Sequence, residues 1–205
     1  MTEQDIVDKV RVILNEAGEE STLTLLSEDT VKLSDYIKKS IPDAVTLVQR
    51  LASDRVVNWK ASSPAVTAAD GGCVLKAPDD FVRIISVKMK SWKRPCHEAF
   101  GVSSEEYKRQ FNKYTRNGAN KPVCFIRPDN SGEKILLFPF TSGDTVEYFS
   151  YEAKYSSSGG LSVGGDSPMA LAVCYTTASI VYSIFENKHS ADVMMQLASQ
   201  YLTKS

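Results

Sequence analysis

Two histidines and four cysteines are the side chains of this 205-residue chain best suited to acid–base, nucleophilic or metal chemistry. Cys96 and His97 are adjacent, so a cysteine–histidine dyad is conceivable. Neighbouring residues of an extended chain point to opposite faces, however, so these two groups cannot easily share a proton. We therefore favour Cys96 as a small apolar residue of the core.

The other candidate groups also favour structural roles. The cysteines stand at positions 73, 96, 124 and 174, without a C-x-x-C pair, and two histidines do not complete a zinc site. Asp79 and Asp80 could act as paired carboxylates, but beside Pro78 we interpret them as turn residues. The phosphate-loop, G-x-G-x-x-G and H-E-x-x-H patterns are missing. We therefore expect a protein that is not an enzyme, with no catalytic residues, cofactor or metal.

Charge is unevenly distributed along the chain. The net charge is −1, so no overall field selects nucleic acid or membrane as a partner. Residues 83–121 carry ten Lys/Arg and three Glu, a balance of +7 that leaves −8 on the remainder. We favour a solvated basic face, and a patch for an acidic partner is the alternative. The segment also contains aromatic residues that could stack single-stranded bases or serve as core and subunit contacts: Trp92, Phe100, Tyr107, Phe111 and Tyr114.

Helical patterns occupy both ends of the chain. Apolar residues recur at helical spacing over 3–17, where Thr2 and Asp5 could form the N-cap and Gly18 should end the helix. A second helix is predicted over 31–52, and Pro42 should kink it or split it in two. Residues 167–185 carry no charge, approaching the length of a membrane span. Their serines, threonines and tyrosines favour a buried helix instead, capped by Asp166. A last helix is predicted over 190–202.

Strand patterns lie between the helices. Residues 81–89 alternate with a period near two, which would place Phe81, Ile85 and Met89 on one face. Further strands are predicted over 73–76, 123–127, 134–138 and 145–155, with a short helix capped by Ser103. They should form an antiparallel sheet or barrel of about four to five strands. Trp59 lies in the segment between the second helix and this β region, and its side chain is expected to be buried as an anchor in the core.

The predicted fold class is α+β, a helical bundle with an antiparallel β insertion. Its parts are an N-terminal helical part (1–72), a β insertion with a short helix (73–155) and a C-terminal helical part (156–205) that packs on the first. The acidic, polar N-terminus does not resemble a secretory signal, so we expect a protein that is not exported and has reduced cysteines.

The order of these motifs resembles the head–tail connector proteins of tailed bacteriophages. The features that carry this resemblance are Ala77-Pro78-Asp79-Asp80-Phe81 at the start of the strand, the basic turn 91–95, Lys134–Pro139 and the tyrosine-rich strand 144–151. Proteins of this kind include the adaptor or tail tubular A proteins of short-tailed phages and the ring proteins of crAss-like phages. The resemblance covers residues 3–186.

The resemblance implies a structural virion protein at the head–tail junction, made in the host cytoplasm, with no membrane partner. It would form a homo-oligomeric ring, typically of twelve copies, that joins the portal to the next tail or ring protein and extends the channel for genome DNA without sequence-specific binding. Candidate contacts between subunits or rings are Trp92, Lys93, Arg94, Phe100 and Tyr107. A nucleic-acid-binding module using the basic-aromatic segment 83–121 remains the alternative.

Overall fold

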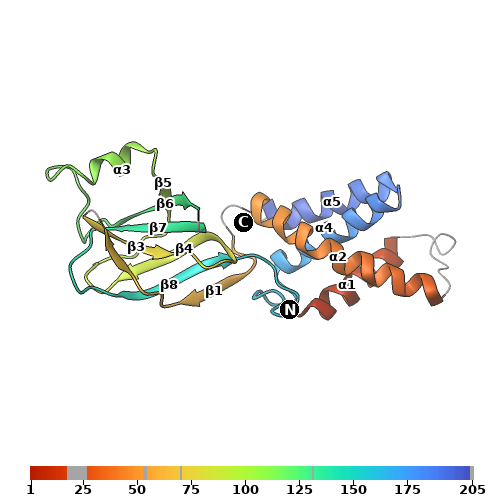
Figure 1. Ribbon diagram of the computed structural model, residues 1–205. Coiled ribbons are helices and arrows are strands. Elements are labelled where there is room, and N and C mark those ends of the chain that lie inside the picture. The colour runs from red at the N-terminus through yellow and green to blue at the C-terminus, as the bar shows by residue number, and fades with distance from the viewer. Residues whose placement is uncertain (18–26, 53–54, 70, 131, 204–205) are drawn as a thin grey trace. The chain divides into compact units, whose positions relative to one another are not determined.

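The computed structural model describes residues 1–17, 27–52, 55–69, 71–130 and 132–203. The chain divides into two compact units, Met1–Asn58 with Lys154–Ser205, and Trp59–Ala153 (Figure 1). We call them the helical unit and the β unit. This arrangement confirms the α+β class with helices at both ends of the chain. The predicted boundaries at residues 72 and 155, and the description as one connector domain, stay predictions.

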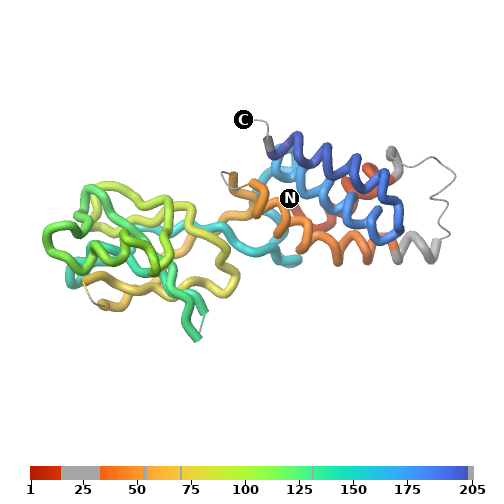
Figure 2. The backbone as a smooth tube through the Cα atoms, turned by 90° about the horizontal axis from the view of Figure 1, so that it is seen from above, coloured from red at the N-terminus to blue at the C-terminus, as the bar shows by residue number. Residues whose placement is uncertain are grey.

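The helical unit packs four helices along one another (Figures 1 and 2). They are α1 (Glu3–Ala17), α2 (Ser27–Leu51), α4 (Pro168–Ile184) and α5 (Lys188–Thr203). The predicted cap of α1 is confirmed, because Thr2 N donates to Asp5 Oδ2 at 2.8 Å and Asp5 N donates to Thr2 Oγ1 at 3.2 Å. The predicted end at Gly18 lies outside the described residues, and α2 begins at Ser27, four residues before the predicted start at residue 31. Helix α2 is continuous through Pro42, so that proline does not split it.

Helix α4 is the centre of the helical unit because it contacts α1, α2 and α5. Being surrounded explains why a helix of 17 residues carries no charge. Its N-cap is Ser167, whose Oγ accepts from Ala170 N at 3.1 Å, and the prediction of Asp166 as the cap was wrong. Among the described residues, no helix is both long and apolar enough to cross a membrane.

The Ser/Gly-rich loop before α4 closes around the start of the chain. The Met1 ammonium donates to Leu161 O at 2.9 Å, and Leu161 N donates to Met1 O at 2.8 Å. Gly160 has φ 61°, and a Cβ there would collide with Met1 O. The loop thus approaches the backbone of Met1 closely, and glycine is required at this position.

The β unit contains two sheets rather than one. The first has the order β1 (Trp59–Ser62), β8 (Val146–Ala153), β4 (Phe81–Met89). The second has the order β2 (Thr67–Ala69), β3 (Gly72–Lys76), β7 (Gly132–Phe138), β6 (Val123–Asp129), β5 (Ala99–Gly101). The hairpin of β6 and β7 is as predicted, but β1 and β2 precede residue 73, and β5 pairs with β6 in parallel. A short helix, α3 (Glu105–Arg109), follows β5, and its N-cap is Ser104 rather than Ser103.

Strand β4 departs from simple alternation. Its register against β8 shifts at three places, and each irregularity changes which side chains face the core. Ile84 is therefore buried where the period of two predicted Ile85. The prediction of Trp59 as a buried anchor was also wrong, because this side chain on edge strand β1 is 52% exposed.

Candidate functional site

The β unit carries a set of exposed cations, which we call the basic surface: Lys90, Lys93, Arg94, Arg109, Lys113, Arg116 and Lys121. None of them forms an ion pair within the part of the chain that the structure describes. The other three cations of the segment are paired, Arg83 with Glu152, Lys88 with Glu147 and Lys108 with Glu105. The excess positive charge predicted from sequence is thus exposed to solvent.

Hydrogen bonds order the loop that carries much of the basic surface. Gln110, only 6% exposed, donates through Nε2 to Asn117 Oδ1 and accepts from Asn117 N through Oε1, both at 3.1 Å. Asn117 Nδ2 donates to Lys121 O at 2.9 Å. Lys93 N donates to Ala119 O at 2.9 Å, which joins the turn 91–95 to this loop. The cations of both segments therefore belong to one ordered region.

Two aromatic side chains of the same loop face solvent. Tyr114 is 83% exposed and Phe111 is 57% exposed. The Lys113 Nζ lies 4.7 Å from the centroid of the Tyr114 ring, within the range of a cation–π contact. An ordered loop with exposed rings between cations is suited to contact an anionic partner through both charge and apolar area.

The five predicted contact residues occupy different environments. Trp92 is 2% exposed, and its Nε1 donates to Pro139 O at 2.8 Å, so it belongs to the core of the β unit in the isolated chain. Lys93 and Arg94 are exposed beside it. Phe100 is 38% exposed, and Tyr107 is half-buried. Both of these rings contact the buried Phe125, at centroid distances of 6.2 Å and 5.1 Å.

The adjacent aspartates Asp79 and Asp80 do different things. Asp80 Oδ2 accepts from Lys60 Nζ at 2.5 Å, and its Oδ1 accepts from Tyr151 OH at 3.1 Å. Burial acts to raise the pKa of Asp80, but these two hydrogen bonds lower it below its usual value. Asp79 is exposed and pairs with Lys76 at 3.8 Å. Asp80 therefore joins β1 and β8, a role that sequence alone did not indicate.

Cys96 and His97 do not form a dyad. The Cys96 side chain is 8% exposed and its Sγ donates to Glu98 O at 3.0 Å. His97 is exposed, and its Nδ1 lies 3.1 Å from Ile85 O. Across the described ranges, no group of three His, Cys, Asp or Glu side chains is arranged to hold a metal ion.

One motif escaped the sequence analysis, since Gly160-Leu161-Ser162-Val163-Gly164 fits the G-x-S-x-G pattern. In hydrolases that serine stands on a sharp turn between a strand and a helix. Here the segment lies in the loop that holds Met1, and Ser162 N donates to Asn58 Oδ1 at 3.2 Å. The context that gives this motif its chemistry is not present, so we assign it no catalytic role.

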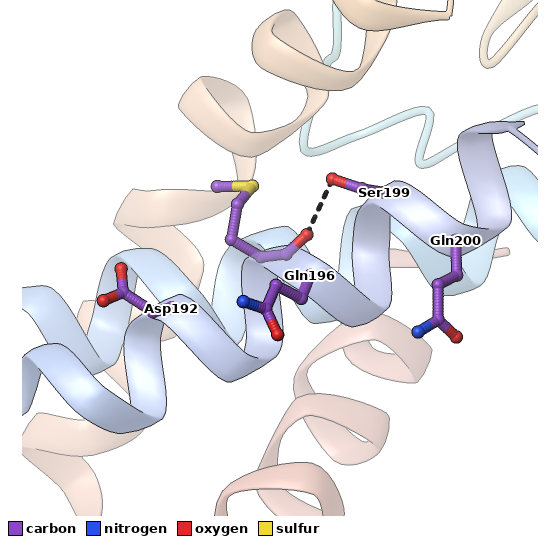
Figure 3. A pocket seen from close by; sticks show the side chains of 5 residues that line it. Asp192, Gln196, Ser199 and Gln200 are labelled. Atoms are coloured by element: carbon purple, nitrogen blue, oxygen red, sulfur yellow. Dashed lines mark hydrogen bonds between the residues drawn. The ribbon is translucent and has the colours of Figure 1, made fainter.

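A shallow hollow lies along one side of α5 (Figure 3). It is lined by residues from successive turns of this helix: Asp192, Met195, Gln196, Ser199 and Gln200. Ser199 Oγ donates back to Met195 O at 2.9 Å. Asp192 is the one titratable group in this lining, so the hollow is not equipped for acid–base catalysis.

Comparison with known proteins gave one informative result. The chain matches the SU10 adaptor protein family over residues 1–203, which is nearly its whole length. No curated protein matches it. The match covers both units, including the last helix, which the sequence resemblance did not reach. The chain therefore belongs to the SU10 adaptor protein family and is a phage adaptor, a structural component of the virion that interacts with other phage structural proteins.

Proposed function

We propose that this adaptor assembles into a homo-oligomeric ring at the head–tail junction, with twelve copies as the expected number. The ring would join the portal to the next tail or ring protein and extend the channel through which genome DNA passes. The observation that carries this proposal is the family match over residues 1–203.

The charge balance supports a channel component. The chain as a whole carries a formal charge of −1, so it lacks the net attraction that would hold a duplex in place. Fixed contacts between cations and phosphates strengthen binding and would slow transit of the genome. The basic surface would then face protein partners rather than the moving DNA.

Within this proposal, Lys93 and Arg94 are the contact residues most available to a neighbouring subunit or ring. Both are exposed, and the hydrogen bond from Lys93 N to Ala119 O keeps their turn in place. Phe100 and Tyr107 would contribute apolar area at the same unit. Trp92 would act indirectly, by supporting the turn from the core.

Electron microscopy and analytical ultracentrifugation of the purified protein, alone and mixed with the portal protein of the same phage, test the ring. We expect ring particles, and weaker association for K93E/R94E. The matched control is K38E/K39E, which makes the same charge change at an exposed pair on α2. A strictly monomeric protein that also fails to bind the portal would refute the proposal.

A second candidate function is binding of single-stranded nucleic acid by the loop 110–121. The exposed Tyr114 and Phe111 rings and the unneutralised cations around them favour it, because such surfaces stack bases and bind phosphates. Titration of a fluorescent oligothymidylate at several salt concentrations tests it. Binding that weakens steeply with salt and is lost in Y114A and K113E/R116E would support it. No binding at low salt would eliminate it.

A further inference from the structure

Three of the four cysteines lie in one core of the β unit. Cys73 is on β3, Cys124 is on β6, and Cys96 is in the segment between β4 and β5. Their side chains are 1%, 0% and 8% exposed, so Cys96 is nearest the surface. Cys174 lies on α4 in the helical unit. This arrangement brings together thiols that are distant in sequence.

Cys96 is held firmly beside Cys124. Cys96 N donates to Val87 O at 2.8 Å, and Val87 N donates to Cys96 O at 2.9 Å. Cys96 Sγ donates to Glu98 O at 3.0 Å, and Glu98 precedes Ala99, the first residue of β5. Ala99 lies directly across from Cys124 in the parallel pair of β5 and β6. Cys96 and Cys124 belong to the same buried cluster, and their two thiols are joined by a hydrogen bond.

The two thiols differ in acidity because of their environments. A hydrogen bond with the Cys124 thiol lowers the pKa of Cys96 to about 7. Burial, together with that hydrogen bond, raises the pKa of Cys124 well above its usual value. At neutral pH Cys96 thus has substantial thiolate character, whereas Cys124 keeps its proton.

The sheet register excludes a bond between Cys73 and Cys124. Cys73 and Cys124 both pair with Leu137, from opposite sides of β7. Two strand spacings separate their Cα atoms by roughly 9–10 Å. A disulfide needs Cα atoms within about 7 Å, so these two cysteines cannot join without moving the strands.

We propose that Cys96 and Cys124 are a redox-modification site that closes to a disulfide when the protein meets a peroxide. The Cys96 thiolate attacks one oxygen of hydrogen peroxide, breaks the O–O bond and becomes a sulfenic acid while hydroxide leaves. The Cys124 sulfur then attacks the Cys96 sulfur, and the sulfenic oxygen leaves as water with the thiol proton. Two thiols are oxidised by two electrons, and the peroxide is reduced to two molecules of water.

The bond would lock the segment that carries four of the seven cations of the basic surface, Arg109, Lys113, Arg116 and Lys121. Residues 97–123 would become a covalently closed loop containing α3 and the ordered loop 110–121. Because a crosslink restricts the unfolded chain more than the folded one, this region should resist opening after oxidation. The inference does not depend on ring formation or on any partner.

Reaction of the full-length protein with hydrogen peroxide, followed by thiol counting, tests the site. Reduced protein is freed of reductant, treated with peroxide, denatured and labelled with N-ethylmaleimide before intact mass and peptide mapping. We expect a loss of two hydrogen atoms, two labelled thiols instead of four, and one disulfide-linked peptide pair containing Cys96 and Cys124. The C73A and C174A variants should give the same bond.

Other outcomes would overturn the proposal. These are four labelled thiols after treatment, a bond that includes Cys73 or Cys174, or Cys96 oxidised to sulfinic acid without a disulfide. Equal oxidation in concentrated urea would also overturn it, since the folded geometry would then be irrelevant. If C124A does not fold, C96A serves instead, because Cys96 lies in the segment between strands. Neither variant should lose two hydrogen atoms.

Discussion

Replacing Arg83 by methionine should destabilise the β unit strongly, because it removes a cation bonded to a buried carboxylate. Arg83 Nε donates to Glu152 Oε2 at 2.5 Å, from neighbouring strands β4 and β8. The Glu152 side chain is 0% exposed, whereas the Arg83 side chain is 30% exposed. Methionine keeps the length and apolar contacts of the arginine stem, so the main change is the loss of charge and of its hydrogen bond.

The expected loss follows from the burial of the pair. Removing one partner of a buried ion pair costs about 3–5 kcal/mol. Because Arg83 is partly solvated, we expect the lower end, about 3 kcal/mol of unfolding free energy. The matched control is K108A, which breaks the exposed pair with Glu105 on α3 and should cost less than about 1 kcal/mol.

Tryptophan fluorescence isolates this effect. Both tryptophans of the chain, Trp59 and Trp92, lie in the β unit, so their emission during urea denaturation follows that unit. Far-ultraviolet circular dichroism follows mainly the four long helices of the other unit. We expect R83M to shift the fluorescence transition to lower urea much more than K108A does.

The double variant R83M/E152Q tests whether the buried charge of Glu152 causes the loss of stability. In R83M/E152Q the buried group is neutral but retains an amide that can hydrogen-bond, so part of the lost stability should return. Additive losses, or an R83M loss no larger than that of K108A, would show that the buried charge is not the source of the effect.

Three further predictions concern packing and titration. G72A should lower the free energy of unfolding by about 1–3 kcal/mol, because the added Cβ would lie 2.7 Å from a backbone oxygen of β7. G118A is the control in the same urea assay, and it should change this free energy little because the added Cβ would have no atom within 4 Å. Alkylation of Cys96 by iodoacetamide should rise with a midpoint near pH 7, and a midpoint near that of an ordinary thiol would contradict this. Burial and the bonded Asp80 raise the pKa of Tyr151 to about 12, so the stability of the β unit should fall as pH rises from about 10 to 12. Y151F should flatten that fall, and an unchanged slope would count against it.

The elements with strong local patterns could be predicted from sequence. The apolar faces of α1 and α2, the hairpin of β6 and β7 and the break before α4 depend on periodicity and turn residues within a few positions. Even the cap of α1 follows from Thr2 and Asp5 alone. Errors at the caps of α3 and α4 were one residue each, because adjacent serine or aspartate residues offer equivalent oxygens.

Predictions that depended on neighbours in space were less accurate. Trp59 has the composition of a core residue, but it lies on the edge strand of a three-stranded sheet. Ile84 is buried in the core, whereas Ile85 was expected there. The difference arises from the register shifts in the pairing of β4 with β8. Strands β1 and β2 were not predicted. They have four and three residues, and segments this short do not show an alternating pattern.

The amino-acid sequence alone was enough to predict the helical ends, the β region between them, the excess of positive charge over 83–121 and the resemblance to phage connectors. The three-dimensional fold was needed to show which of those cations are paired, that Trp92 is buried, and that Cys96 is hydrogen-bonded to Cys124 while β7 lies between Cys73 and Cys124. The physical reason is that helix faces and turns follow from neighbours in the chain. Ion pairs, buried thiols and exposed rings follow instead from strand register and long-range contacts, which bring together residues that no local pattern relates.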